Sequence, residues 1–188
     1  MKAVLLINHG GPEMLRYGEA PDPTAGPGEV VVDIHAASVN AADYKVRLGG
    51  GRYSLNRFPH ILGRDFSGVV SAIGAGVTDF TVGDAVFGVT DQGIEGAYAE
   101  RIAINAAIIA KKPDRLSHAE AAALGLTSLT ALTAIEDTAQ LKAGQTISDP
   151  RRRRRGRGIW RATRQASRCD GDHDGQCQQS PLCARPRR

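Results

Sequence analysis

The chain has 188 residues, of which 41% are hydrophobic, and a formal net charge of +4 at neutral pH. This length suits one domain or slightly more, and it allows a substantial core without disulfide support. The apolar run AVLLI after Lys2 is too short for a signal peptide or a membrane span, so a cytoplasmic protein that does not enter membranes is expected.

The charge is distributed unevenly along the chain. Residues 1–147 contain 12 Lys and Arg and 16 Asp and Glu, which gives a net charge of −4. Residues 148–188 contain 12 Arg and 4 Asp, a net charge of +8, together with all three cysteines of the chain. The basic isoelectric point therefore comes from the last segment, and this indicates two different compositions joined near residue 147.

Short apolar runs separated by turn residues dominate the first part of the chain. The predicted strands are residues 2–7, 29–39, 66–77, 84–89, 96–104 and 108–113. Pro and Gly in residues 20–29 predict a loop. Several short strands with turn signals between them favour a mainly β fold, either a barrel or a sandwich.

The pattern becomes helical after residue 115. Ser117, with Glu120 three residues later, matches a capping box, so a helix is predicted to begin there. A second helix is predicted over LTALTAIEDTAQ, residues 129–140. Residues 143–147 then predict a turn into a new strand, which is typical of the start of an α/β unit.

Four motifs in residues 1–147 together resemble one known family. They are SVNAADYKVR (38–47), FPHILGRDFSGVVSAIGAGVTDFTVGDAVFG (58–88), GAYAE (96–100) and AAALGLTSLTAL (121–132). The chain is similar to the zinc-free, quinone oxidoreductase-like branch of the medium-chain dehydrogenase/reductase superfamily. The resemblance implies a GroES-like β-barrel over residues 1–115, followed over 116–147 by helices that lead into a truncated Rossmann domain.

The resemblance also implies an activity and its site. The activity is hydride transfer from NADPH, or from NADH, to a quinone or an enone, by an enzyme that is often homodimeric. Asn40 and Asp43 are the expected catalytic residues, and Asn40, Tyr53 and Thr130 are expected to bind the cofactor. Each has a structural explanation as well: Asn40 and Asp43 cap a turn, Tyr53 lies on the surface, and Thr130 packs within a helix.

Zinc is not expected in this part of the chain. Zinc-dependent relatives have a Cys where this chain has Asn40 and a His where it has Arg64. Neither an amide nor a guanidinium is a suitable ligand for catalytic zinc. Residues 1–147 also contain no cysteine, so the four-cysteine structural zinc site of such relatives is not expected either.

The basic segment is compatible with several binding functions. Arg151 to Arg155 can neutralise phosphates, so a GroES-like scaffold with a nucleic-acid-binding tail is the alternative to an oxidoreductase. DGDHDG (170–175) imitates the start of a calcium loop, but the twelfth position is Pro181 instead of Glu. The cluster of Cys169, His173, Cys177 and Cys183 lacks the paired C-x-x-C spacing of a zinc site.

A shifted reading frame is the favoured explanation of the same segment. In the family, GQTI is followed by a strand and a glycine-rich turn of the type ILIHGGAGGVG, where the backbone approaches the cofactor pyrophosphate. If Asp149-Pro150-Arg151 is encoded GAT CCA CGG, dropping one base gives Ile-His-Gly. Continuing the shift converts the arginines and GRGIW into GGAGGVGAFG, and RATRQASR into AQLARQAA.

The hypothesis is therefore a frameshift near residue 148, with residues 148–188 as a disordered tail. Such a tail binds nucleic acid only non-specifically. Without the pyrophosphate turn, the chain alone is expected to be inactive and to show no saturable NADPH binding in a fluorescence titration. Resequencing the coding DNA around codon 148 tests the frameshift directly, because the hypothesis requires a glycine-rich continuation in the restored frame.

Overall fold

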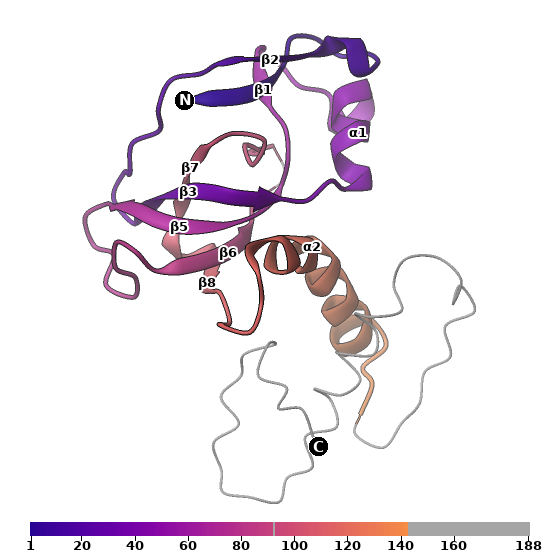
Figure 1. The fold of residues 1–188 in the computed structure, drawn as a ribbon. Helices are drawn as coiled ribbons and strands as arrows, with labels where there is room; N and C mark the ends of the chain where they lie inside the picture. Colours follow the sequence, from indigo (N-terminus) through magenta and orange to yellow (C-terminus); the bar gives the residue numbers. More distant parts are fainter. Residues whose placement is uncertain (92, 143–188) are drawn as a thin grey trace, which may run out of the picture. The chain divides into compact units, whose positions relative to one another are not determined.

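The computed structural model describes residues 1–91 and 93–142, in two units: Met1–Gly125 and the residues from Leu126 onward (Figure 1). The first unit consists mainly of antiparallel strands in two sheets, with the orders β2-β1-β4 and β7-β3-β5-β6-β8. The strands are β1 (Lys2–Leu6), β2 (Leu15–Glu19), β3 (Glu29–Ala37), β4 (His60–Ile61), β5 (Asp65–Ile73), β6 (Ala85–Val89), β7 (Arg101–Asn105) and β8 (Ile109–Lys111). The predicted mainly β fold is confirmed.

Helical segments are few in the described residues. α1 (Ala41–Leu48) follows β3, and α2 (His118–Thr133) follows β8. A π-helical turn, Ala134–Thr138, continues directly from α2. The remaining helical segments are short 3-10 turns: Pro12–Met14, Gly51–Tyr53 and Ala106–Ile108. None of the helices among the described residues has the length and apolar character needed to cross a membrane.

Two apolar clusters hold the first unit together. The larger cluster consists mainly of buried side chains from the strands of the five-stranded sheet. They include Val30, Val32, Phe66, Val70, Val86, Ile102 and Ile104. The smaller cluster joins Leu6 of β1, Val46 of α1 and Leu62. Burying such side chains contributes roughly 1.5–3 kcal/mol each. The smaller cluster therefore fixes α1 beside the three-stranded sheet, as Figure 1 shows.

Some elements differ from the sequence prediction. β2, α1 and β4 were not predicted, because β2 lacks an apolar run, β4 has only two residues, and α1 lies in a segment interpreted as a turn. The strand predicted over 96–104 begins only at Arg101. The preceding backbone is used elsewhere: the N–H groups of Ala97 and Tyr98 donate to the carbonyls of Gly63 and Leu62.

The start of α2 is capped as the sequence predicts. The Ser117 backbone N–H donates to Glu120 Oε2 at 2.9 Å, and the Glu120 N–H donates to Ser117 Oγ at 3.2 Å. The described residues then form one α-helix instead of two, since the segment contains no proline. Gly125 does not end the helix, and a Cβ there would lie 3.0 Å from both Asp65 Oδ1 and Val89 Cγ2. Close packing thus explains this glycine.

Ser117→Ala is expected to destabilise the protein by about 1 kcal/mol, because it removes one half of the capping box. Thermal unfolding followed by circular dichroism measures the loss. Ser54→Ala is the matched control: Ser54 is an exposed serine that follows a 3-10 turn. An equal loss in both variants would contradict a specific role for the cap.

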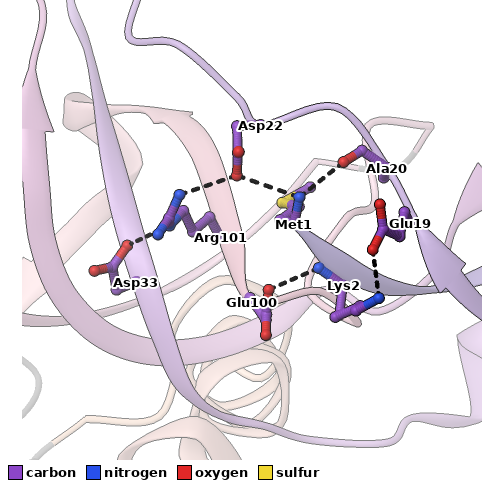
Figure 2. Close-up of polar contacts among 8 residues, drawn as sticks. All are labelled: Met1, Lys2, Glu19, Ala20, Asp22, Asp33, Glu100 and Arg101. Carbon is purple, nitrogen blue, oxygen red and sulfur yellow. Dashed lines mark hydrogen bonds and ion pairs between the residues drawn. The ribbon is translucent and has the colours of Figure 1, made fainter.

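The N-terminus is tied to three other segments by a chain of polar contacts, shown in Figure 2. Arg101 lies between two carboxylates and donates to Asp22 Oδ1 at 3.0 Å and to Asp33 Oδ1 at 3.1 Å. The Met1 ammonium group donates to Ala20 O at 2.9 Å and lies 3.4 Å from Asp22 Oδ1. Because Asp22, Asp33 and Arg101 are exposed, these pairs fix the path of the chain more than they stabilise the fold.

Several sequence predictions fall on residues 143–188, outside the described residues. They are the new strand after residue 142, the disordered tail, the frameshift near residue 148, and the weak calcium and zinc motifs. Each of them stays a prediction.

Candidate functional site

The junction between β3 and α1 gathers the polar side chains of the candidate site. β3 ends at Ala37, and Asn40 is the N-cap of α1. Asparagine is among the preferred N-cap residues because its side chain can satisfy open N–H groups of the first turn. Asn40 and Asp43 form a capping box, in which the Asn40 backbone N–H donates to Asp43 Oδ2 at 2.7 Å.

Asp65, the first residue of β5, accepts hydrogen bonds from two side chains of this junction. Its side chain is fully buried, and its Oδ2 accepts hydrogen bonds from Ser38 Oγ at 2.6 Å and from Asn40 Nδ2 at 2.8 Å. Asn40 Nδ2 also donates to Ser38 Oγ at 3.2 Å. The three side chains thus form a closed triangle of hydrogen bonds, which we call the Asp65 triangle.

Asp43 is buried next to the Asp65 triangle and is linked to Tyr98. Its Oδ2 accepts from the Tyr98 hydroxyl at 2.7 Å, and its Oδ1 has no hydrogen-bond partner among the described residues. Burial raises the pKa of Asp43 above its ordinary value, and the negative charges of Asp65 and Glu95 raise it further, against the lowering effect of its two hydrogen bonds. Asp43 therefore favours its neutral form more than an exposed aspartate does.

Tyr98 is held in place from three directions. Its backbone N–H donates to Leu62 O at 2.9 Å, and its carbonyl accepts from the Val4 N–H at 2.8 Å, so its backbone is anchored to β1 and to the segment after β4. Its ring covers Gly63, where a Cβ would lie 2.3 Å from Tyr98 Cδ1. Burial, and then the neighbouring Asp43, raise the pKa of Tyr98 far above its ordinary value, so the hydroxyl keeps its proton and remains a donor.

A second polar pair links β4 to the segment between β6 and β7. His60 Nε2 is 3.1 Å from Glu95 Oε2, and the Glu95 side chain is 1% exposed. Burial by itself raises the pKa of Glu95, but the hydrogen bonds from His60 and from the Gly93 N–H outweigh it and bring the pKa below its ordinary value. Arg64 is nearby in sequence, and its Nε and Nη2 both donate to Thr90 O, at 2.9 and 2.6 Å.

Glu95→Gln is expected to reduce stability at pH 7 by about 1 kcal/mol, because the charge-assisted hydrogen bonds become neutral ones. The folded-state pKa of Glu95 is depressed, so its contribution is present above the unfolded-state value near 4.5 and is lost as the pH falls through the folded-state pKa. Melting temperatures between pH 3 and pH 7 should therefore depend less on pH in this variant. Glu136→Gln, at an exposed position, is the control. Parallel curves for Glu95→Gln and wild type would contradict the assignment.

The first residue of α2 forms a separate cluster with β3 and β5. His118 Nδ1 lies 2.8 Å from Ser67 Oγ, and Ser67 Oγ donates to Val86 O at 2.8 Å. The hydroxyl proton is thereby used, so the hydrogen of the His118 contact belongs to Nδ1. The His118 ring also lies 4.5 Å from that of His35, at an irregularity in the β3–β5 register. Burial, and then the His35 and Lys112 charges, lower the pKa of His118.

Within the first unit, the structure joins two of the predicted site residues. Asn40 and Asp43 are joined by the capping box. Tyr53 lies at the end of a 3-10 turn and packs on the cluster of Leu6, Val46 and Leu62, with Lys45 Nζ 5.8 Å from its ring centroid. Thr130 belongs to the second unit, where its hydroxyl donates to the carbonyl one turn earlier, Leu126 O, at 2.8 Å.

Three residues of the site were not predicted: Ser38, Asp65 and Tyr98. All three stand inside the motifs that indicate the family, SVN, GRD and GAYAE. Ser38 and Asp65 are 27 residues apart in the sequence, and Tyr98 and its partner Asp43 are 55 residues apart. Contacts over such separations leave no periodic pattern in the sequence. The available indication was their position in these motifs, which did not show that the three side chains contact Asn40 and Asp43.

Metal ligands are not assembled in the described part of the chain. No group of three or more His, Cys, Asp or Glu side chains in residues 1–91 and 93–142 is arranged to hold a metal ion. Asn40 donates its amide protons to the Asp65 triangle, and the Arg64 guanidinium donates to a carbonyl. The Asn40 nitrogen and the Arg64 guanidinium therefore both act here as hydrogen-bond donors.

Comparison with known proteins shows which protein families this chain is similar to. Residues 26–114 match the alcohol dehydrogenase GroES-like domain. The chain is 33% identical over 149 residues to the quinone oxidoreductase of Homo sapiens, covering 78% of this chain and 44% of that protein. It is 39% identical over 122 residues to a mycocerosic acid synthase-like polyketide synthase of Mycobacterium tuberculosis, covering 65% of this chain and 6% of the synthase.

A solved structure shows the same relationship. The quinone oxidoreductase of Escherichia coli, complexed with NADPH, superposes with a TM-score of 0.70 at 30% identity, covering 77% of this chain and 43% of that one. The chain thus spans less than half the length of these relatives. The predicted GroES-like domain is confirmed, and so is the predicted resemblance of the chain to the quinone oxidoreductase-like branch of the medium-chain dehydrogenase/reductase superfamily.

Proposed function

We propose that the described residues form the substrate-side domain of an NAD(P)H-dependent oxidoreductase that reduces a quinone or an enone without zinc. The observation that supports this most directly concerns Asn40, which follows β3 and is half-buried. Its side chain is held by a hydrogen bond to the buried carboxylate of Asp65. The E. coli relative named above was solved with NADPH, which favours NADPH over NADH.

The described residues fit the nicotinamide end of such a cofactor. Asn40 presents an amide oxygen that can accept a hydrogen bond, and Tyr98 stays protonated beside Asp43. The bound cofactor would supply the hydride. The roles of this chain are then to orient the nicotinamide riboside through Asn40, to keep Asn40 fixed through Asp65, and to exclude water with the apolar cluster around Leu62.

A zinc-free mechanism agrees with the chemistry of Asn40 and Arg64. A catalytic zinc ion needs thiolate, imidazole or carboxylate ligands, and at these two positions the chain has an amide and a guanidinium. Hydride transfer then depends on positioning and on hydrogen bonds to the carbonyl oxygen of the substrate. We place the protein in the cytoplasm as a homodimer, with nucleic acid binding only non-specifically to the arginine-rich segment.

A chimeric enzyme tests the proposed activity. Residues 1–142 of this chain replace the corresponding part of the E. coli quinone oxidoreductase, and NADPH oxidation is followed at 340 nm with a quinone and with an enone. Turnover with either substrate is expected, together with a reduction of about tenfold or more on Asn40→Ala, because precise positioning is lost. A folded chimera that neither binds nor oxidises NADPH would contradict the proposal.

A further inference from the structure

The Asp65 triangle determines which way round the amide of Asn40 lies. Asp65 Oδ2 is 2.8 Å from Asn40 Nδ2, and an ionised carboxylate only accepts hydrogen bonds. The amide atom that faces Asp65 must therefore be the nitrogen. A flipped amide would place two acceptor oxygens in contact beside a fully buried side chain, which is strongly unfavourable.

Both protons of the Asn40 amide are consumed within the protein. One is donated to Asp65 Oδ2 and the other to Ser38 Oγ, at 3.2 Å. Ser38 Oγ is able to accept because its own proton is donated to Asp65 Oδ2 at 2.6 Å. Every proton in the triangle thus has one acceptor, and Asn40 has no donor left for a ligand.

The oxygen of the same amide retains accepting capacity. An amide oxygen has two lone pairs, and the capping box uses at most one of them, towards the Asp43 N–H. Asn40 is half-buried, whereas Asp65 is fully buried. A ligand that reaches this junction therefore meets an acceptor, with the donor side of the amide turned inward.

We propose that Asp65 and Ser38 are positioning residues that lock the Asn40 amide with its nitrogen inward, so that Asn40 recognises a hydrogen-bond donor on the ligand. This inference rests on the proposed function. A nicotinamide riboside has such donors, namely the ribose hydroxyls and the carboxamide amine. The carbonyl oxygen of a quinone or an enone has none, so Asn40 binds the cofactor and leaves the substrate oxygen to other groups.

Exchange of the side-chain amide protons tests the lock in the full 188-residue chain. Nuclear magnetic resonance of the 15N-labelled protein resolves the Asn40 amide pair, which is assigned by its loss in Asn40→Asp. Both Asn40 protons are expected to exchange with water at least about tenfold more slowly than those of Asn105. Asn105 is the internal reference, because it is exposed and caps a 3-10 turn through its oxygen.

Ser38→Ala separates the two amide protons. It removes the acceptor of one proton and leaves Asp65 for the other, so one Asn40 proton should exchange faster while its partner stays slow. Ser54→Ala should change neither. Asn40 protons that exchange as fast as those of Asn105, or that do not respond to Ser38→Ala, would overturn the proposal.

Two small probes, added to the chimeric enzyme described above, test the preference for donors. Reduced nicotinamide mononucleotide carries the ribose hydroxyls and the carboxamide, while 2-cyclohexenone has only an acceptor. The mononucleotide should shift the Asn40 amide resonances and the enone should not; the reverse result would overturn the proposal. If the mononucleotide shifts no resonance of the chimera, the proposed function fails, whereas amide exchange in the 188-residue chain decides independently on the two positioning residues.

Discussion

Gly63→Ala is expected to lower the free energy of unfolding by about 2–5 kcal/mol. The backbone of Gly63 has a φ of +89°, a conformation that costs an L-residue about 1–2 kcal/mol. The added Cβ would also lie 2.3 Å from Tyr98 Cδ1 and 2.9 Å from Tyr98 Cγ, close to the base of the side chain. The ring must therefore move, and overpacking of this kind costs roughly a further 1–3 kcal/mol.

The displacement of Tyr98 extends the effect into the candidate site. The Tyr98 hydroxyl is one of the two donors to Asp43 Oδ2. Without it, a buried carboxyl group whose pKa is already raised by burial loses a stabilising hydrogen bond. Asp43 should then bind a proton at a still higher pH, and the stability of the variant should fall further as the pH rises from acidic to neutral.

Denaturant unfolding with matched variants separates strain from crowding. Gly76→Ala is the control for strain, since Gly76 has a φ of +85° and nothing lies within 4 Å of an added Cβ. In a Tyr98→Ala background, Gly63→Ala should cost no more than Gly76→Ala, because the crowding partner is gone. An equal cost of Gly63→Ala in both backgrounds would show that the Tyr98 ring is not the cause.

The strands were predictable where their apolar residues follow one another closely. β1, β3, β5 and β6 lie within or next to the runs that predicted them, because burial of β-branched side chains leaves a local pattern. α1 was not predicted, although Asn40 and Asp43 have the spacing of a capping box. The segment AADYKVRL is too short for a clear helical period, and its packing on Leu6 and Leu62 comes from distant parts of the chain.

In the candidate site too, residues within one motif were predictable, whereas contacts between distant parts of the sequence were not. Asn40 and Asp43 were predicted from the family resemblance of the motif that contains both, and their contact spans only three residues. The contacts of Asn40 with Asp65 and of Asp43 with Tyr98 span 25 and 55 residues. They depend on how β3, β5 and the segment before β7 meet. The motifs contain all these residues, but only the fold reveals that they form one hydrogen-bonded network.

Asn40→Asp is expected to destabilise the protein by about 3 kcal/mol at pH 7. The substitution keeps the shape of the side chain and a good N-cap, so α1 itself should tolerate it. It also replaces Nδ2, which lies 2.8 Å from Asp65 Oδ2, with a second carboxylate oxygen next to a side chain that is fully buried. An uncompensated buried charge of this kind typically costs about 3–5 kcal/mol.

The loss should depend on pH in a direction that identifies its cause. The two carboxyl groups can share a proton, so the apparent pKa of one of them in the folded state rises above the unfolded value of about 3.9. The folded variant then binds that proton more tightly than the unfolded chain does. Its deficit should be small below about pH 4 and should grow as the pH rises through the raised pKa.

Unfolding curves at intervals between pH 4 and pH 8 measure this dependence, and Asn105→Asp is the matched control. Asn105 is also an N-cap, and its side chain accepts from the Ala107 N–H at 2.9 Å, a role that a carboxylate fills equally well. Asn105→Asp should therefore leave stability nearly unchanged at every pH. If Asn40→Asp behaves in the same way as Asn105→Asp, the Asn40 nitrogen does not face Asp65, and the orientation assigned to this amide is wrong.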